Sequence, residues 1–204
     1  MNRRSHIYRL TRLALVAALA TWTLACGGGG GGNVVTPPPM GLTASFTPDN
    51  ANPGPNTLNM TATPTGGANF TIEINVTDIT DFFGAGFRVT YDPATAQYVG
   101  FSSTGSTLVL NTPVGATTDF RVDPRPGGEL WIDATLQGQV QGITVPVNVT
   151  ELLLTLSFSA IGATNGNAFG FDVPATRVVT TCPAPPTACS DIAVNWSGGT
   201  MRAN

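Results

Sequence analysis

The chain has 204 residues, contains no lysine, and has one histidine, His6. Four of its nine basic residues lie within the first 25 positions, so five arginines face all twelve acidic residues in the remainder. This negative balance excludes nucleic-acid binding, which needs cations to neutralise phosphates. With no lysine and no histidine beyond His6, Ser–His–Asp, Cys–His and Ser–Lys catalysis and a His-ligated metal are also excluded.

Residues 1–25 have the organisation of a secretory signal peptide. Four arginines precede an apolar run at positions 13–24, which is shorter than the roughly 20 residues that span a bilayer. The sequence Leu24-Ala25-Cys26 resembles the lipobox of bacterial lipoproteins, although Thr23 stands where that motif usually has leucine. The resemblance implies export, lipidation of Cys26, and membrane attachment through lipid alone, with Gly27 favouring the outer membrane. The alternative is an ordinary signal peptide that leaves Cys26 as an odd thiol.

Residues 26–41 are predicted to form a tether. Positions 27–32 are all glycine, which gives a flexible chain, and Thr36-Pro37-Pro38-Pro39 extends it stiffly. The Gly/Pro-rich composition ends near Met40, so the folded domain is predicted to cover residues 42–204.

Alternation of apolar and polar residues predicts β-strands at 70–77, 87–91 and 130–136. Residues 152–158 are more continuously apolar, as in a central strand. Turn-forming residues separate these runs at 64–67, 92–93, 123–128, 165–167 and 197–199. No segment has an apolar stripe of helical period, and residues 93–97 could form one helical turn at most. The pattern predicts an all-β sandwich.

A pair of carboxylates is the one catalytic device that the composition leaves open. The glutamates are Glu73, Glu129 and Glu151, and solvated strand positions explain all three. We therefore expect no enzymatic activity and no cofactor. Calcium ligands are a second option, since four aspartates lie in or beside predicted loops, but no EF-hand pattern occurs and turn-forming roles explain them better. These aspartates are Asp78, Asp81, Asp172 and Asp191, and no metal is expected.

Two cysteines, Cys182 and Cys189, enclose a short segment that contains three prolines. In an exported chain, such a close pair predicts a disulfide. Zinc binding is the alternative, but the chain offers no further ligands for a tetrahedral site.

Trp131 belongs to the polar face of its predicted strand, together with Asp133 and Thr135. An exposed tryptophan on a sheet can stack on a sugar ring or anchor a protein partner. The alternative is that a loop covers it and the ring is simply packed.

The order of these segments resembles that of a cohesin domain. The resemblance rests on residues 70–78, on 84–93 with its Tyr91-Asp92-Pro93, and on 98–101. It continues through 120–123, 129–136, 152–160, 169–172 and 195–201, and so covers nearly all of the predicted domain.

The resemblance implies a nine-stranded jelly-roll β-sandwich, related to some carbohydrate-binding modules, that binds dockerin modules. The binding face would contain Arg88, Thr90, Arg121, Trp131, Asp133 and Gly170. Gly84 and Gly86 depart from the family, which often places Asn and Asp side chains there. The expected function is a membrane-tethered, non-catalytic module for a protein partner, with a possible link to polysaccharide breakdown. Two alternatives stay open: a carbohydrate-binding module and a structural or adhesive surface protein.

Overall fold

The computed structural model describes residues 41–181 and 189–204. The described residues form twelve β-strands, the helix α2 (Thr107–Leu110) and the 3-10 turn η1 (Val173–Ala175). In chain order the strands are β1 (Ala44–Pro48), β2 (Thr57–Pro64), β3 (Asn69–Thr77), β4 (Gly84–Thr90), β5 (Ala96–Ser102), β6 (Thr117–Arg125), β7 (Glu129–Gln137), β8 (Thr150–Ala160), β9 (Thr164–Phe171), β10 (Arg177–Val179), β11 (Asn195–Ser197) and β12 (Gly199–Ala203).

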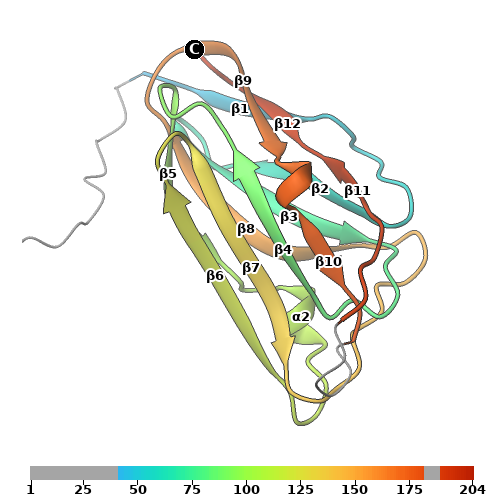
Figure 1. The fold of residues 1–204 in the computed structure, drawn as a ribbon. Coiled ribbons are helices and arrows are strands. Elements are labelled where there is room, and N and C mark those ends of the chain that lie inside the picture. The colour runs from blue at the N-terminus through green and yellow to red at the C-terminus, as the bar shows by residue number, and fades with distance from the viewer. Residues whose placement is uncertain (1–40, 182–188) are drawn as a thin grey trace, which may run out of the picture. The chain divides into compact units, whose positions relative to one another are not determined.

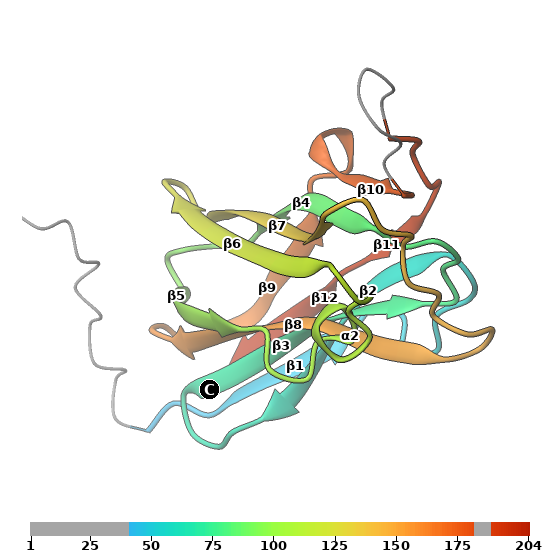
Figure 2. The same ribbon diagram turned by 90° about the horizontal axis from the view of Figure 1, so that it is seen from below.

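The strands form two sheets that pack face to face (Figures 1 and 2). The larger sheet has the order β1-β12-β9-β4-β7-β6, and β10 pairs with β4 off this path. The smaller sheet has the order β11-β2-β3-β8-β5. All pairings are antiparallel except that of β11 with β2. The predicted jelly-roll sandwich is confirmed, and the strand number exceeds nine partly because β10 and β11 are separate strands of three residues each.

The core lies between the inward faces of the two sheets. Phe70 and Phe158 of the smaller sheet stack on each other, and Phe158 meets Phe169 of the larger sheet edge-on at 5.0 Å between centroids. Phe87 on β4 is likewise buried and contacts Trp196 across the sandwich. Burial of this kind stabilises a fold by roughly 1.5–3 kcal/mol for each large apolar side chain. The inner face of the larger sheet is therefore closely packed, and its outer face stays free to carry polar and charged side chains.

The turn predicted at 165–167 is wrong, the turn predicted at 123–128 is found only at 126–128, and one helix was missed. Residues 165–167 lie inside β9, where Asn167 is buried, because tertiary contacts override the local turn preference of Asn-Gly. Asp123 and Pro124 lie inside β6, where proline is tolerated because β6 is an edge strand. The helix α2 is too short to produce a periodic apolar stripe.

Among the described residues, no helix has the length and apolarity needed to cross a membrane.

Candidate functional site

The outer face of the larger sheet brings the predicted binding residues together. Alternation along β7 buries Leu130, Ile132 and Ala134 and turns Trp131 and Asp133 outward. The register then sets their neighbours, because directly paired residues of antiparallel strands project from the same face. All six predicted residues lie on this sheet: Arg88 and Thr90 on β4, Arg121 on β6, Trp131 and Asp133 on β7, and Gly170 on β9.

Trp131 is 39% exposed and is braced by arginines from both flanking strands. Arg88 lies opposite it on β4, and its guanidinium carbon is 4.3 Å from the centroid of the indole ring. Arg125 reaches the same ring from β6, at 4.5 Å. Such cation–π contacts contribute roughly 0.5–1 kcal/mol each at exposed sites. The two contacts hold the ring in place, and no loop is needed to account for its orientation.

Carboxylates hold the two bracing arginines in turn. Arg88 is 3.5 Å from both Glu129 on β7 and Asp172 after β9, and Arg125 pairs with Asp123 on its own strand. Thr90 donates a long hydrogen bond to the carbonyl of Gly170. The tryptophan is thus the centre of a network in which the charges are paired.

A groove of about 470 Å³ lies beside this network, over the two glycines of β4. Gly86 stands in a cross-strand row between Arg177 of β10 and Asp133 of β7, and Arg121 of β6 follows Asp133 in the same row. The groove is lined by Gly84, Ala85, Gly86, Asp119, Arg121, Asp133, Thr135, Arg177 and Val179. A second hollow of about 270 Å³ connects Gly86 and Asp133 with Trp131.

Close neighbours explain the glycine at position 84 of β4, and the side chain of Asp133 occupies the space above Gly86. A Cβ on Gly84 would lie 2.7 Å from Oγ1 of Thr135 and 2.9 Å from the carbonyl oxygen of Ala134, closer than such atoms approach. A Cβ on Gly86 would lie 3.0 Å from Oδ1 of Asp133. The departure from the cohesin pattern at these positions therefore leaves a floor of bare backbone.

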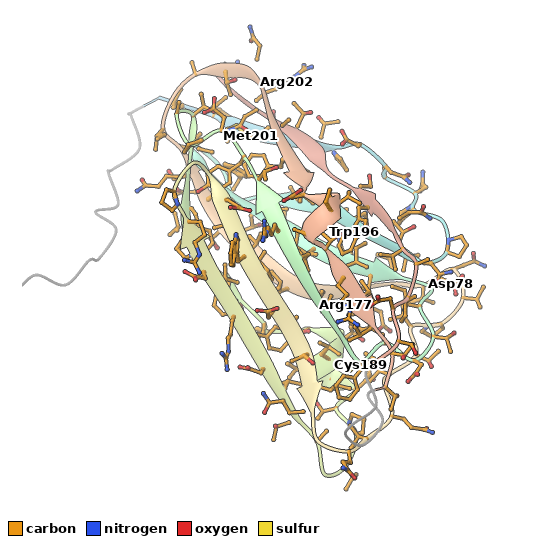
Figure 3. All side chains as sticks on the ribbon, in the orientation of Figure 1. Asp78, Arg177, Cys189, Trp196, Met201 and Arg202 are labelled. Carbon is orange, nitrogen blue, oxygen red and sulfur yellow. The ribbon has the colours of Figure 1, made fainter. Side chains whose placement is uncertain are left out.

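Strand β10 borders the groove through Arg177 and Val179, and the turn η1 borders the second hollow through Ala175. β10 pairs with β4 over Gly84–Gly86, whereas β9 pairs with β4 further along, at Val89 and Thr90. Arg177 of β10 pairs with Asp191 and donates a hydrogen bond from Nη2 to the carbonyl oxygen of Cys189 at 3.2 Å. Figure 3 shows Arg177 on the same side of the domain as Cys189. The segment that follows the cysteine loop thus holds one side of the groove.

Several of the other carboxylates considered in the sequence have structural partners. Glu73 accepts hydrogen bonds from Thr61 and Thr63 in the smaller sheet, and Glu151 accepts one from Thr107 of α2. Asp81 accepts a hydrogen bond from the amide of Gly142 and two from Thr181. Glu129 lies in the larger sheet, so the glutamates do not converge on one site. No group of three metal-ligating side chains is found among the described residues.

Sequence reasoning missed three residues of this face: Asp119, Arg125 and Arg177. The sequence does contain a pattern that indicates the first two. Charged and apolar residues alternate along this strand, with Asp119, Arg121, Asp123 and Arg125 on one face and Phe120 and Val122 on the other. Arg177 had no such signal, since β10 becomes a neighbour of β4 only through tertiary pairing.

The predicted lipidation site and half of the predicted disulfide lie outside the described residues. Cys26 and Cys182 belong to the segments 1–40 and 182–188. Cys189 is disulfide-bonded, and its pairing with Cys182 stays a prediction.

No protein-family model and no curated protein sequence matches this chain. Solved structures do match it. A chain of the CaDoc0917–CaCohA2 complex aligns with a TM-score of 0.50 and 13% identity, covering 78% of this chain and 97% of its own. The sixth cohesin of scaffoldin B from Acetivibrio cellulolyticus, solved with a Cel5 dockerin, gives a TM-score of 0.47, 12% identity and coverages of 78% and 96%. A non-cellulosomal cohesin from Archaeoglobus fulgidus gives a TM-score of 0.43, 8% identity and coverages of 77% and 88%.

Proposed function

Because the domain has a cohesin-like jelly-roll fold, we propose that it is a non-catalytic module whose outer β4-β7-β6 face binds a protein partner that carries a dockerin-type module. One observation carries the proposal: Trp131 is partly exposed and is braced by Arg88 and Arg125. Tryptophan and arginine dominate the binding energy of protein interfaces, and a side chain held in place before binding loses less entropy.

The same observation weighs against the carbohydrate alternative. A sugar ring stacks on a free aromatic face, whereas two guanidinium groups already contact the indole of Trp131. The described residues include two tryptophans, Trp131 and Trp196. Trp196 packs against Phe87 and Phe171, so Trp131 is the one that is exposed on a sheet face. A protein partner that adds contacts around the braced ring fits this arrangement better.

Binding to immobilised dockerin modules tests the proposal. We expect the wild-type domain to be retained by at least one dockerin from a representative panel, and Trp131→Ala to weaken that binding tenfold or more. Arg202→Ala is the matched control, because Arg202 is exposed on β12, two strands away from β4. Melting curves of both variants check the fold. Failure of every dockerin, or full binding by Trp131→Ala, would overturn the proposal.

Affinity electrophoresis with soluble polysaccharides separates the alternative function. Retardation of the wild-type domain by a polysaccharide, lost in Trp131→Ala, would favour carbohydrate binding over protein binding. We expect equal mobility with and without polysaccharide for both proteins.

The proposed setting of this module is the outer membrane, through a lipid on Cys26. Support comes from the arginine-rich apolar leader, the sequence Leu24-Ala25-Cys26 and the glycine tract that follows it. Fractionation of the full chain tests the anchor: the wild type is expected with the membranes and Cys26→Ser in the soluble fraction. A Cys26→Ser protein that stayed with the membranes would contradict the anchor.

A further inference from the structure

The charges around the glycine-floored groove are unequally satisfied. Arg121 contacts Oδ2 of Asp119 through both Nε and Nη2, each at 2.9 Å. Arg177 is engaged by Asp191 and by the carbonyl of Cys189. Within the described residues, the carboxylate of Asp133 has neither an ion pair nor a hydrogen bond. The groove therefore holds one uncompensated charge, and it is negative.

The geometry places this charge over the empty position in β4. Oδ1 of Asp133 is 3.0 Å from the point that a Cβ of Gly86 would occupy, so the carboxylate leans over the glycine backbone. Asp133 also lines both hollows of the face. Directly beyond Gly86 in the same cross-strand row stands Arg177, whose Nε and Nη2 are engaged by Asp191 and by the carbonyl of Cys189. An entering group would thus meet a carboxylate without an ion-pair partner beside arginines that each already have one.

We propose that the groove receives a basic side chain of the partner, with its cationic head on Asp133 and its aliphatic stem along Gly84, Gly86 and Val179. Lysine and arginine have this form, an apolar stem that ends in a charged donor, and charge-assisted hydrogen bonds are the strongest that a carboxylate accepts. The excess of acidic residues over arginines beyond the first 25 positions steers a cationic surface toward the domain. The inference rests on the proposed function, since it names what the partner presents to the same face.

An anionic side chain fits the groove less well. Arg121 and Arg177 are the only cations in its lining among the described residues, and each already has a carboxylate partner. An incoming carboxylate would share an arginine with Asp119 or Asp191 and would meet the negative charge of Asp133. A cation meets no such competition.

NMR titration of the isotope-labelled exported chain tests the groove without a known partner. The probe is N-acetylarginine amide, and the control is N-acetylcitrulline amide, which has nearly the same shape but no charge. We expect shifts at the amides of Gly84, Gly86, Asp133 and Thr135 with the arginine probe only, reduced by added salt. Equal responses to both probes, or no response at these amides, would overturn the proposal.

Two variants localise the effect. Asp133→Asn should abolish the response to the arginine probe, whereas Asp49→Asn should keep it, because Asp49 is exposed after β1 and does not line the groove. Both changes remove one negative charge from the domain, so a general loss of charge would affect them equally. Loss of the response in both variants would contradict a specific role of Asp133.

The dockerin assay separates this inference from the function on which it rests. If a dockerin binds the wild type and Asp133→Asn weakens binding about tenfold, both stand. If a dockerin binds and Asp133→Asn changes neither affinity nor salt dependence, the inference fails and the proposed function stands. If no dockerin binds but the response to the arginine probe still depends on Asp133, the proposed function fails and the inferred binding of a basic side chain in the groove stands.

Discussion

Asn167 and Asp92 are joined by two hydrogen bonds of opposite sense. The backbone amide of Asp92 donates to Oδ1 of Asn167 at 2.8 Å, and Nδ2 of Asn167 donates to the carbonyl oxygen of Asp92 at 2.9 Å. Nδ2 also donates to Oγ1 of Thr95 at 2.8 Å. Asn167 is only 2% exposed and therefore acts as a buried clip between β9 and the turn that follows β4.

Asn167→Ala is expected to lower the free energy of unfolding by about 1–3 kcal/mol, because it removes the partner of the Asp92 amide and the bonds from Nδ2 to the Asp92 carbonyl and to Thr95. Asn165→Ala is the matched control: Asn165 is exposed on the same strand, and its replacement should change stability by less than about 0.5 kcal/mol. Urea denaturation of the two variants measures both effects. Equal stability of the two variants would show that the clip contributes little.

Two adjacent glycines in the β6–β7 turn are expected to differ in how much an alanine substitution destabilises the domain. Gly127 and Gly128 both have positive φ, but a Cβ on Gly127 meets open space, whereas a Cβ on Gly128 would lie 2.1 Å from the carbonyl oxygen of Tyr91. Gly127→Ala should cost about 1 kcal/mol from the left-handed conformation alone. Gly128→Ala should cost about 3 kcal/mol or more, since the contact between Tyr91 and residue 128 must break.

Thermal unfolding of these two variants measures the difference. A similar loss in both would mean that the turn moves away from Tyr91 at little cost. Such movement would also disturb Arg125 and Trp131, which lie on either side of the turn.

The sequence was sufficient to predict the outer face but not its internal contacts. Alternation along residues 130–136 places Trp131 and Asp133 on one side, because the side-chain period of a strand is fixed. The contacts of Trp131 with Arg88 and Arg125 depend on the register of β4 with β7 and of β6 with β7. Register across non-local strand pairs follows from tertiary packing, so no local pattern predicts it.

The role of the β4 glycines is likewise set by tertiary packing and could not be predicted from the local sequence. In the sequence, Gly84 and Gly86 count only as missing polar side chains. In the structure they form the floor of a groove, because Thr135 and Asp133 of the neighbouring strand occupy the adjacent space. Asn167 is a third case, since a turn-forming residue in local terms becomes a buried strand residue through its bonds to Asp92.

Two partly buried tyrosines are expected to make the stability of the domain depend on pH above 10. Burial, with a smaller contribution from Tyr91, raises the pKa of Tyr98 to about 12. Burial also raises the pKa of Tyr91, partly offset by a hydrogen bond with the backbone of Tyr98. In the unfolded chain these phenols ionise near the ordinary value of 10.0. Stability should therefore be complete below pH 10 and decline as the pH rises toward about 12, because the unfolded state loses its protons first.

Tyr98→Phe tests this dependence. The chain contains no lysine, so few other groups titrate in the same range. The variant should show a flatter decline of the denaturation midpoint with pH than the wild type, and ultraviolet absorbance should follow tyrosinate formation directly. A decline of the same slope in Tyr98→Phe would assign the effect to another group.

The predicted disulfide between Cys182 and Cys189 closes a loop whose ends are already held together. The amide of Thr180 donates to the carbonyl oxygen of Ser190 at 2.9 Å, and that of Ile192 donates to Val178 at 2.8 Å. A Cys182→Ser, Cys189→Ser double variant should therefore keep the fold and lose about 2.5 kcal/mol, since the bridge chiefly constrains the unfolded chain. Urea denaturation of the double variant, and of the wild type with and without reductant, measures this loss. Two free thiols besides Cys26 in the unreduced, exported protein would refute the pairing. Complete unfolding on reduction would show that the backbone hydrogen bonds at the two ends of the loop are not sufficient to hold the β10–β11 connection.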